Sequence, residues 1–443
     1  MNGLESAGNR VCGIGLAGCG TVGMGVVRTL ARNGALIRQR LAADVTLEVK
    51  KILVRDLAKH RSGEVAPELF TRDWQAVVED PAVSVVVELI GGTDLAFTIV
   101  ARALELGKPV VTGNKALLAE RGEELFGLSR KYNTPIHFEA AVAGGIPIIK
   151  SVREAFVGNR ITAMTGIING TSNYILQRMA EAGLDFQSAL AEAQQLGYAE
   201  ADPTLDVNGW DAAHKAILLA TLAYGFPIAT ESVHVLGIQQ VKPIDIEFAK
   251  QLGYVVKLLA VIREHSEGAV EIRLQPSFVS RSHILASVNG VFNAVAVHGD
   301  AVGDAVFYGR GAGQDPTASA VVADLVEAAS ACGAEGKHRG FLPWSEGGSL
   351  VPIEDTETAY YVRFDVTDRL GVIAEIAQVL AAAKIGISGT HSPVNPEDPE
   401  AAFVDMVFLL HRCPYGTLQQ ALKKIEALDC VNSPPVVFRI EVL

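Results

Sequence analysis

A glycine-rich turn near the start of the chain limits the possible folds more than any other feature of the sequence. Residues 11–17, VCGIGLA, are typical of a buried strand, and Gly18, Gly20 and Gly23 follow with the spacing Gly-x-Gly-x-x-Gly before a helix-like segment. In this context the spacing is a dinucleotide-binding fingerprint, because the glycines permit a tight turn and bring a pyrophosphate to the helix N-terminus. A glycine-rich turn that binds no nucleotide is the alternative.

The alternation of strand-like and helix-like segments continues to about residue 145, which predicts an α/β fold with a Rossmann-like, doubly wound parallel sheet. Arg55 and Asp56 follow the second predicted strand, where such folds contact the adenosine ribose. Arg55 suits the 2′-phosphate of NADP and Asp56 the 2′-hydroxyl of NAD, and we favour NADP. Lys115 follows a buried strand at the edge where open sheets bind ligands, although a solvated lysine at a helix start fits equally well.

Glu139 and the loop at residues 142–147 end this predicted sheet domain. We expect an unpaired acid beside a kinked backbone whose carbonyls turn away from regular hydrogen bonding. Such oxygens suit a hard cation such as Na⁺, and a plain interdomain hinge is the alternative. Farther along, the loop GRGAG at 309–313 precedes a helix whose N-terminus is expected to face the cofactor; a glycine-rich crossover is the alternative.

The chain of 443 residues is too long for one hydrophobic core and suggests about three domains. Segments 256–279 and 283–299 are predicted strands of an antiparallel sheet, and the last module has the order βαββαβ, which is ferredoxin-like. The expected parts are a nucleotide-binding domain at 1–149, an α+β catalytic and dimerisation domain at 150–305, a helix at 306–333 returning to the nucleotide domain, a linker at 334–356 and the last module at 357–443.

Charge and composition exclude several classes of function. The formal charge of −12, with no offsetting Lys/Arg cluster, argues against a nucleic-acid partner. The sequence has no uninterrupted apolar run of about 18 residues and no visible signal peptide, so we expect a cytoplasmic protein without a membrane span. The five scattered cysteines predict reduced, mostly buried thiols, and the ten histidines form no metal-ligand pair.

Residues 197–215, GYAEADPTLDVNGWDAAHK, crowd ionisable side chains around a predicted helix start. Asp211 and Lys215 are four residues apart, so on a helix they lie on one face, one turn apart. The continuation AILLATLAYGF is apolar nearly all round, which predicts a buried helix. An ordinary helix ion pair is the alternative, but three acids just upstream favour a functional site with shifted pKa values. These acids are Glu200, Asp202 and Asp206.

Together these segments resemble homoserine dehydrogenase, in the monofunctional bacterial form with a C-terminal ACT domain. The resemblance spans essentially the whole chain and rests on GLAGCGTVGMGV, VVTGNK, GIINGTSNYIL and, most specifically, GYAEADPTLDVNGWDAAHK. It implies the NAD(P)-dependent interconversion of L-aspartate 4-semialdehyde and L-homoserine, a step toward threonine, isoleucine and methionine. Reduction of the aldehyde leaves an alkoxide that needs a proton.

The resemblance also implies a role for each residue of the reaction site. Lys215 would donate the proton, Asp211 would hold the substrate and the lysine in register, and Lys115 would stabilise the developing oxyanion. Glu200 and Asp206 would bind the ammonium and hydroxyl end of the amino-acid substrate. Thr171 and Tyr198 would complete the substrate pocket.

Cofactor and cation contacts are implied in the same way. The expected NAD(P) contacts are Gly18, Gly20, Thr21, Val22, Gly23, Arg55, Thr93, Lys115 and Gly311. A structural Na⁺ would be bound by the Glu139 side chain and the backbone oxygens of Val142, Gly144 and Ile146.

The last module resembles an ACT domain, whose turn at Asp368, Leu370 and Gly371 would bind a small amino acid at a subunit interface. Threonine is the expected feedback effector, and a dimerisation module without a ligand is the alternative. Because two ACT sheets usually pair edge to edge, we expect a homodimer or homotetramer.

Two other functions compete with this interpretation. An aldehyde-oxidising dehydrogenase, such as aspartate semialdehyde dehydrogenase, needs a cysteine nucleophile, and no cysteine occurs from Asn33 to Ala331. A ligand sensor, in which the nucleotide domain only reads redox state, predicts that Lys215 is dispensable.

Overall fold

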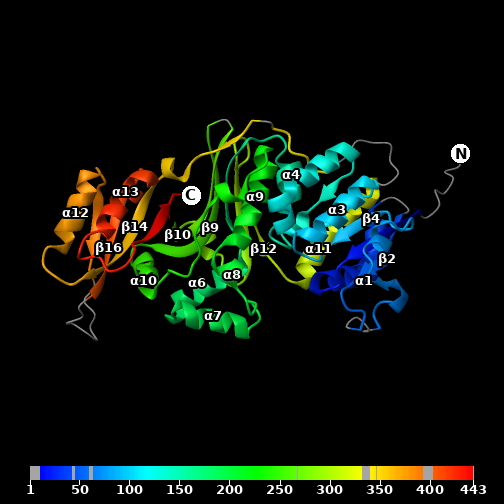
Figure 1. Ribbon diagram of the computed structural model, residues 1–443, viewed down its shortest axis with the longest axis horizontal. Helices are drawn as coiled ribbons and strands as arrows, with labels where there is room; N and C mark the ends of the chain where they lie inside the picture. Colours follow the sequence, from blue (N-terminus) through cyan, green and yellow to red (C-terminus); the bar gives the residue numbers. More distant parts are fainter. Residues whose placement is uncertain are drawn as a thin grey trace. The chain divides into compact units, whose positions relative to one another are not determined.

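The computed structural model describes residues 10–41, 45–58, 63–266, 268–331, 340–345, 347–392 and 403–442. Cys332 and the part of the predicted linker at 334–339 lie outside the described residues. The chain divides into two compact units, each built from three stretches of sequence (Figure 1). The first unit contains Met1–Thr162, His214–Ser232 and Phe292–Gly348, and the second contains Ala163–Ala213, Val233–Val291 and Ser349–Leu443.

The first unit is built on a six-stranded parallel sheet with the order β3-β2-β1-β4-β5-β6. Strands β4 and β5 are buried throughout, as expected for a parallel sheet covered on both faces. This is the Rossmann strand order, so the predicted doubly wound sheet is confirmed. The strands are β1 (Arg10–Ala17), β2 (Val45–Leu53), β3 (Phe70–Thr71), β4 (Val85–Glu88), β5 (Val110–Thr112) and β6 (Ile136–His137).

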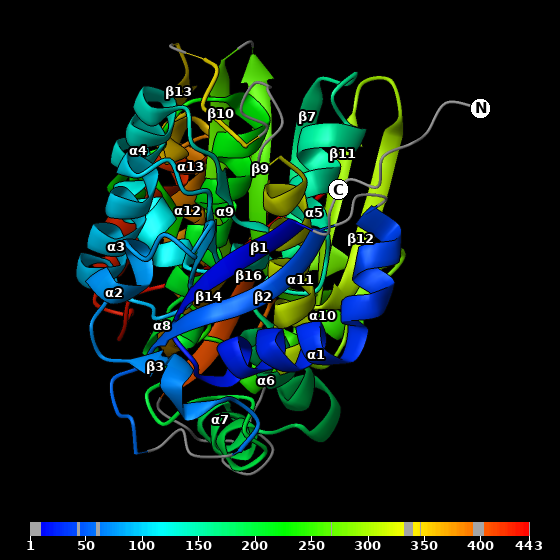
Figure 2. The same ribbon diagram turned by 90° about the vertical axis from the view of Figure 1, so that its right-hand side faces the viewer.

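Helices cover both faces of this sheet (Figure 2). Helices α1 (Thr21–Leu41) and α11 (Gln314–Ala331) pack together on one face, where Val26 and Leu325 join Ile14 and Leu16 in one apolar core. Helices α3 (Asp94–Glu105) and α4 (Lys115–Tyr132) lie on the other face. Thr93 is the N-cap of α3, and Asp94 is its first residue.

Shorter elements complete the first unit. A hairpin of two antiparallel strands precedes α11, and short helical turns follow β6. They are α2 (Gln75–Val78), η2 (Glu139–Ala141), α5 (Ile148–Lys150), β11 (Phe292–Gly299) and β12 (Gly303–Arg310).

The second unit holds a larger sheet with the order β7-β9-β10-β17-β14-β16-β15, and short β8 (His234–Val235) and β13 (Ser349–Leu350) also pair with β10. The predicted antiparallel pairing within 256–279 is confirmed as β9 with β10. The predicted strand at 283–299 is wrong in its first half, where His283 caps a turn of 3₁₀-helix by accepting from the Leu285 N–H. The remaining elements are β7 (Ile161–Ile167), α6 (Gly170–Ala182), α7 (Phe186–Gln195), α8 (Thr204–Val207), α10 (Pro243–Gln251), β9 (Tyr254–Ser266) and β10 (Ala269–Ser280). Helix α9 (Trp210–Tyr224) begins in this unit and belongs to the first unit from His214 onward.

The C-terminal module has the predicted βαββαβ order. Its strands pair antiparallel in the order β17-β14-β16-β15, which is the ferredoxin-like arrangement, and Tyr360, Phe364, Phe408 and Leu418 belong to its own core. The elements are β14 (Glu357–Thr367), α12 (Val372–Ala382), β15 (Ile387–His391), β16 (Phe403–Pro414), α13 (Tyr415–Glu426) and β17 (Val436–Glu441).

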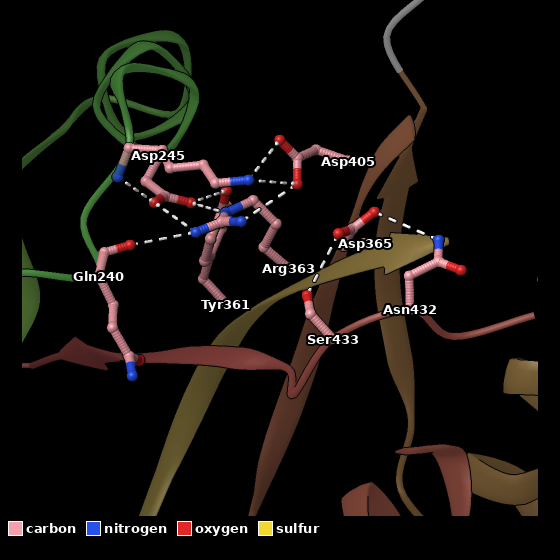
Figure 3. Close-up of polar contacts among 9 residues, drawn as sticks. Gln240, Asp245, Tyr361, Arg363, Asp365, Asp405, Asn432 and Ser433 are labelled. Carbon is pink, nitrogen blue, oxygen red and sulfur yellow. Dashed lines mark hydrogen bonds and ion pairs between the residues drawn. The ribbon is translucent and has the colours of Figure 1, made fainter. Parts of the chain in front are cut away.

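A buried ion pair joins this module to α10 (Figure 3). Arg363 on β14 donates from Nε to Asp245 Oδ1 at 2.8 Å and from Nη1 to Asp405 Oδ1 at 3.1 Å, and its side chain is 3% exposed. The Tyr361 hydroxyl donates to the same Asp245 oxygen at 2.8 Å. Asp245 also caps α10 by accepting from the Lys242 N–H, so this one carboxylate organises both elements.

Two sequence-based expectations concern single residue types. The four cysteines that the structure describes, Cys12, Cys19, Cys413 and Cys430, are free and buried, as predicted. Among the described residues, no helix has the length and apolar character needed to cross a membrane.

Candidate active site

The glycine turn between β1 and α1 fits a dinucleotide, and each glycine is required for a different reason. Gly18 has a φ of +103°, and a Cβ there would lie 2.6 Å from the Leu89 carbonyl oxygen. A Cβ on Gly23 would lie 2.2 Å from the Gly18 oxygen, so only glycine lets α1 approach the turn. A Cβ on Gly20 would meet no described atom within 4 Å beyond its chain neighbours, which leaves this position open for a pyrophosphate.

The other predicted cofactor contacts lie at the start of α1, after β2 and at the start of α3. Thr21 is the first residue of α1, and the half-buried Val22 packs against the core of the sheet. Arg55 is exposed just after β2, next to Asp56, whose carboxylate accepts from the Ala58 N–H at 2.8 Å. Thr93 is the N-cap of α3.

A buried carboxylate that the sequence analysis did not identify orders two loops at the ligand-binding edge of the sheet. Glu88, the last residue of β4, accepts from the Ile90 N–H at 2.9 Å and from the Thr112 hydroxyl at 2.6 Å. Asn114 extends the network by donating to the Gly92 carbonyl at 2.7 Å. Burial raises the pKa of Glu88, while these hydrogen bonds favour its charged form. The only sequence signal was an acid in an otherwise apolar strand.

Lys115 begins α4 directly after this network. Asn114 caps the helix by accepting from the Leu117 N–H at 3.1 Å, so the backbone at Lys115 is held in place. A cation at a helix N-terminus faces the positive end of the helix dipole and gains no stability from it. This position therefore suits a lysine that interacts with a ligand better than one that supports the helix.

The loop containing Gly311 also lies near the glycine turn. Gln314, the first residue of α11, donates to the Thr21 carbonyl oxygen at 3.0 Å, which brings the N-terminal ends of α1 and α11 side by side. A Cβ on Gly311 would overlap the Asn293 side chain at 2.0 Å, and a Cβ on Gly144 would lie 2.4 Å from the Gly311 oxygen. The loops around Gly144 and Gly311 thus pack backbone against backbone.

Glu139 is buried at the start of the predicted cation loop, but it is not the unpaired acid that the sequence analysis expected. Its two oxygens accept from the N–H groups of Ile149 and Lys150, each at 2.9 Å, and so cap the short helix α5. Burial raises the pKa of Glu139. Each carboxylate oxygen keeps a second lone pair, so these bonds leave capacity for a cation.

The predicted kink in this loop is present. Ala143 and Gly144 have positive φ angles of 53° and 50°. The Ile146 oxygen accepts from the Ile148 N–H at 2.8 Å, and a carbonyl oxygen in this position can accept a second contact. The residues therefore fit a cation site without requiring one.

Near Glu139 lies a second group of side chains that could ligate a metal ion, but basic side chains already balance its negative charge. His137, Asp324 and Glu327 bring their ligand atoms within 4.8 Å of one another. However, Lys150 and Arg153 approach Glu327 at 3.0 and 2.7 Å. Burial raises the pKa of Asp324 to about 8, and its Oδ2 accepts from the Glu139 N–H at 2.8 Å. We therefore interpret this group as a structural charge network.

Helix α9 has the predicted character. It begins at Trp210, and Asp211 and Lys215 lie on its first two turns, both half-buried. The helix is buried from Ala216 to Ala220. The acidic end of this segment is organised by Asn169, whose Nδ2 donates to Asp206 Oδ1 at 2.6 Å and to Asp211 Oδ2 at 2.8 Å. The structure thus brings two of the predicted acids together through a residue that the sequence analysis did not select.

Of the other predicted substrate residues, Thr171 lies on the first turn of α6, and Tyr198 and Glu200 follow the end of α7. The Thr171 hydroxyl donates to the Tyr198 carbonyl at 2.7 Å, so these two residues are adjacent, while Tyr198 and Glu200 are exposed. Asp202 has a different role: its Oδ1 accepts from the Thr204 N–H at 3.1 Å and supports the turn before α8.

The predicted effector turn connects β14 to α12. Gly371 has a φ of 96° and forms the N-cap of α12, and Leu370 is 98% exposed. Asp368 is exposed at the end of β14. An apolar side chain that makes so little contact with its own unit is suited to a ligand or a second subunit.

The parallel sheet, its glycine turn and the lysine at its ligand-binding edge define an NAD(P)-dependent oxidoreductase. A family model described as "Homoserine dehydrogenase, NAD binding domain" matches residues 18–139, and one described as "Homoserine dehydrogenase" matches residues 147–326. The chain is also 41% identical over 436 residues to the homoserine dehydrogenase of Neisseria gonorrhoeae. This match covers 97% of this chain and 98% of that relative. The chain belongs to the homoserine dehydrogenase family.

Solved structures agree with this assignment. The crystal structure of a homoserine dehydrogenase from Thiobacillus denitrificans is similar with a TM-score of 0.89 at 41% identity, covering 98% of each chain. A hyperthermophilic archaeal homoserine dehydrogenase in complex with NADPH has a TM-score of 0.62 at 29% identity, covering 72% of this chain and 97% of that one.

Proposed function

We propose that the protein reduces L-aspartate 4-semialdehyde to L-homoserine with NADPH, reversibly, as a step toward threonine, isoleucine and methionine. The observation that carries this proposal is the pairing of Asp206 with Asp211 through Asn169, one helical turn before Lys215 on α9. A pair of carboxylates suits the ammonium group of an amino acid, and a lysine suits the proton that must follow hydride.

The roles follow from the charges of the side chains. When bound, the nicotinamide supplies hydride to the aldehyde carbon. Lys215 donates the proton that converts the resulting alkoxide to the hydroxyl, and it regains a proton from solvent. Lys115 stabilises the negative charge on that oxygen, while Glu200, Asp206 and Asp211 bind the substrate, with Thr171 and Tyr198 at the pocket wall.

NADP is the proposed cofactor. In support, Arg55 is exposed at the end of β2, whereas the neighbouring Asp56 already accepts a backbone hydrogen bond. The archaeal relative that was solved in complex with NADPH is consistent with this preference. Arg55 would pair with the 2′-phosphate.

A Na⁺ ion is proposed at Glu139 and the backbone oxygens of Val142, Gly144 and Ile146, in a structural role. The positive φ angles in this loop and the remaining lone pairs of its oxygens support the site. Because Gly144 packs against Gly311, an ion here would stiffen the loop that precedes α11.

The C-terminal module is proposed to be an ACT domain that binds threonine at Asp368, Leu370 and Gly371 in a homodimer or homotetramer. Support comes from the ferredoxin-like sheet and the 98% exposure of Leu370. Threonine inhibition should weaken in Leu370→Ser and Asp368→Ala, with kcat retained, and should persist in Val157→Ser, a control at an 82% exposed apolar residue. Unchanged inhibition in both module variants would place the effector site elsewhere.

Oxidation of NADPH with aspartate semialdehyde tests the activity itself. Lys215→Ala should lose most of kcat, by about a hundredfold or more for loss of a general acid, while NADPH still binds. Lys250→Ala, at an exposed lysine of α10, should remain near wild type. Wild-type kcat in Lys215→Ala would remove the proton-donor role, and a wild-type protein without turnover would refute the proposed activity.

A further inference from the structure

Asn169 connects three helices through one side-chain amide. It directly precedes α6, is 5% exposed, and caps that helix by accepting from the Ser172 N–H at 2.8 Å. Its Nδ2 donates to Asp206 on α8 at 2.6 Å and to Asp211 on α9 at 2.8 Å. The amide therefore uses its oxygen for one helix and both of its N–H groups for the two carboxylates.

This arrangement solves an electrostatic problem. Two carboxylates that share one binding region repel each other, and repulsion tends to protonate one of them or push them apart. An Arg or Lys between them would cancel the negative charge that an ammonium ligand needs. A neutral amide with two donors holds both acids in place and adds no positive charge of its own.

The position of Asn169 is itself closely determined. A Cβ on the next residue, Gly170, would lie 2.7 Å from the Val291 carbonyl oxygen, so the chain is pressed against its neighbours here. The Ser172 hydroxyl donates to the backbone oxygen of Asp206 at 2.9 Å, which fixes α8 by a second contact. The first turn of α6 thus sets the backbone and the side chain of Asp206 together.

We propose that Asn169 is a positioning residue, which sets the separation and orientation of the Asp206 and Asp211 carboxylates for the ammonium group of the substrate. This inference rests on the proposed function, because it requires that these acids bind an amino-acid substrate. It assigns no chemical step to Asn169.

Asn169→Asp is the informative substitution, because it keeps the size and the capping oxygen but removes both donors and adds a third carboxylate. The KM for aspartate semialdehyde should rise about tenfold or more, as expected when hydrogen bonds to charged groups are lost, while the KM for NADPH changes less than about twofold. Lower pH should partly restore the KM, because neighbouring carboxylates raise the pKa of the introduced group and its protonated form regains one donor.

Two further variants make the test independent of folding defects. Asp185→Asn exchanges the N-cap of α7, which accepts from the Ser188 N–H at 2.7 Å, and should leave both KM values unchanged. Asn169→Ser keeps a capping oxygen but cannot reach both carboxylates, so it should also raise the substrate KM, without recovery at low pH. A wild-type substrate KM in Asn169→Ser, or in a folded Asn169→Asp enzyme at every pH, would overturn the proposal. An inactive wild-type enzyme would instead refute the proposed function.

Discussion

Single buried polar side chains determine how the loops around the candidate site are held. Glu88 joins two loops at the edge of the parallel sheet, and Asn169 joins two acids of the second unit. In the sequence Glu88 is one acid in an apolar strand, and Asn169 is the first residue of the polar stretch NGTSN. A buried polar side chain needs hydrogen-bond partners. The sequence pattern does not identify these partners, because they come from distant parts of the chain.

Lys257 shows the energetic consequence of a buried charge. Its Nζ donates to the Val288 carbonyl at 2.6 Å and to Asn173 Oδ1 at 3.0 Å, and burial lowers its pKa to about 8. The unfolded chain therefore holds more protons than the folded chain between about pH 8 and the ordinary pKa of 10.5, so stability should rise with pH across this window.

The free energy of unfolding of the wild type, relative to Lys257→Met, should increase by on the order of 3 kcal/mol between these pH values. Urea unfolding at several pH values measures the difference, and Lys250→Met provides the control at an exposed lysine. A difference that does not change with pH would mean that Lys257 titrates at the same pH in both states.

The proposed preference for NADP depends on a single side chain, that of Arg55. Arg55→Ala should raise the KM for NADPH about tenfold, because a charge-assisted contact to phosphate is lost, and should change the KM for NADH little. Asp56→Ala is the matched variant and should affect NADH more. Equal effects of Arg55→Ala on both cofactors, in initial-rate measurements, would contradict the 2′-phosphate role.

At the scale of elements, two glycines of the turn between β1 and α1 should have different roles: Gly23 in stability and Gly20 in cofactor binding. Gly23→Ala should destabilise the protein by about 1–3 kcal/mol, because the new Cβ would meet the Gly18 oxygen. Gly20→Ala should leave stability within about 0.5 kcal/mol, since the added atom points into open space, but should raise the KM for NADPH. Thermal unfolding and initial rates compare the two. A stable Gly23→Ala or a wild-type KM in Gly20→Ala would contradict this division.

Elements with a strong local pattern were predictable. Helix α9 is buried as its apolar continuation indicated, and the C-terminal module has its expected βαββαβ order. The errors occur where side chains override the pattern: His283 caps a 3₁₀ turn in an apolar segment, and Glu139 caps α5. Both side chains accept hydrogen bonds from backbone N–H groups, and periodicity cannot detect such contacts.

At the scale of the molecule, a buried ion pair between Arg363 and Asp245 attaches the C-terminal module to α10. Arg363→Met should cost about 3–5 kcal/mol of stability, because it leaves Asp245 buried without its cation. Arg369→Met, which breaks an exposed ion pair with Glu375 in the same module, should change stability little. Equal effects of the two variants in urea unfolding would show that the Asp245 contact is not a major tie.

The sequence by itself determined the parallel sheet with its glycine turn, the buried α9 helix with Asp211 and Lys215 one turn apart, and the order of the C-terminal module. These features depend on periodicity and on the conformational freedom of glycine, which are properties of neighbouring residues. Only the tertiary structure decided that α11 packs against α1, that Arg363 pairs with Asp245, and that Asn169 joins Asp206 to Asp211. These contacts link residues far apart in the chain, and their geometry exists only after the elements have packed.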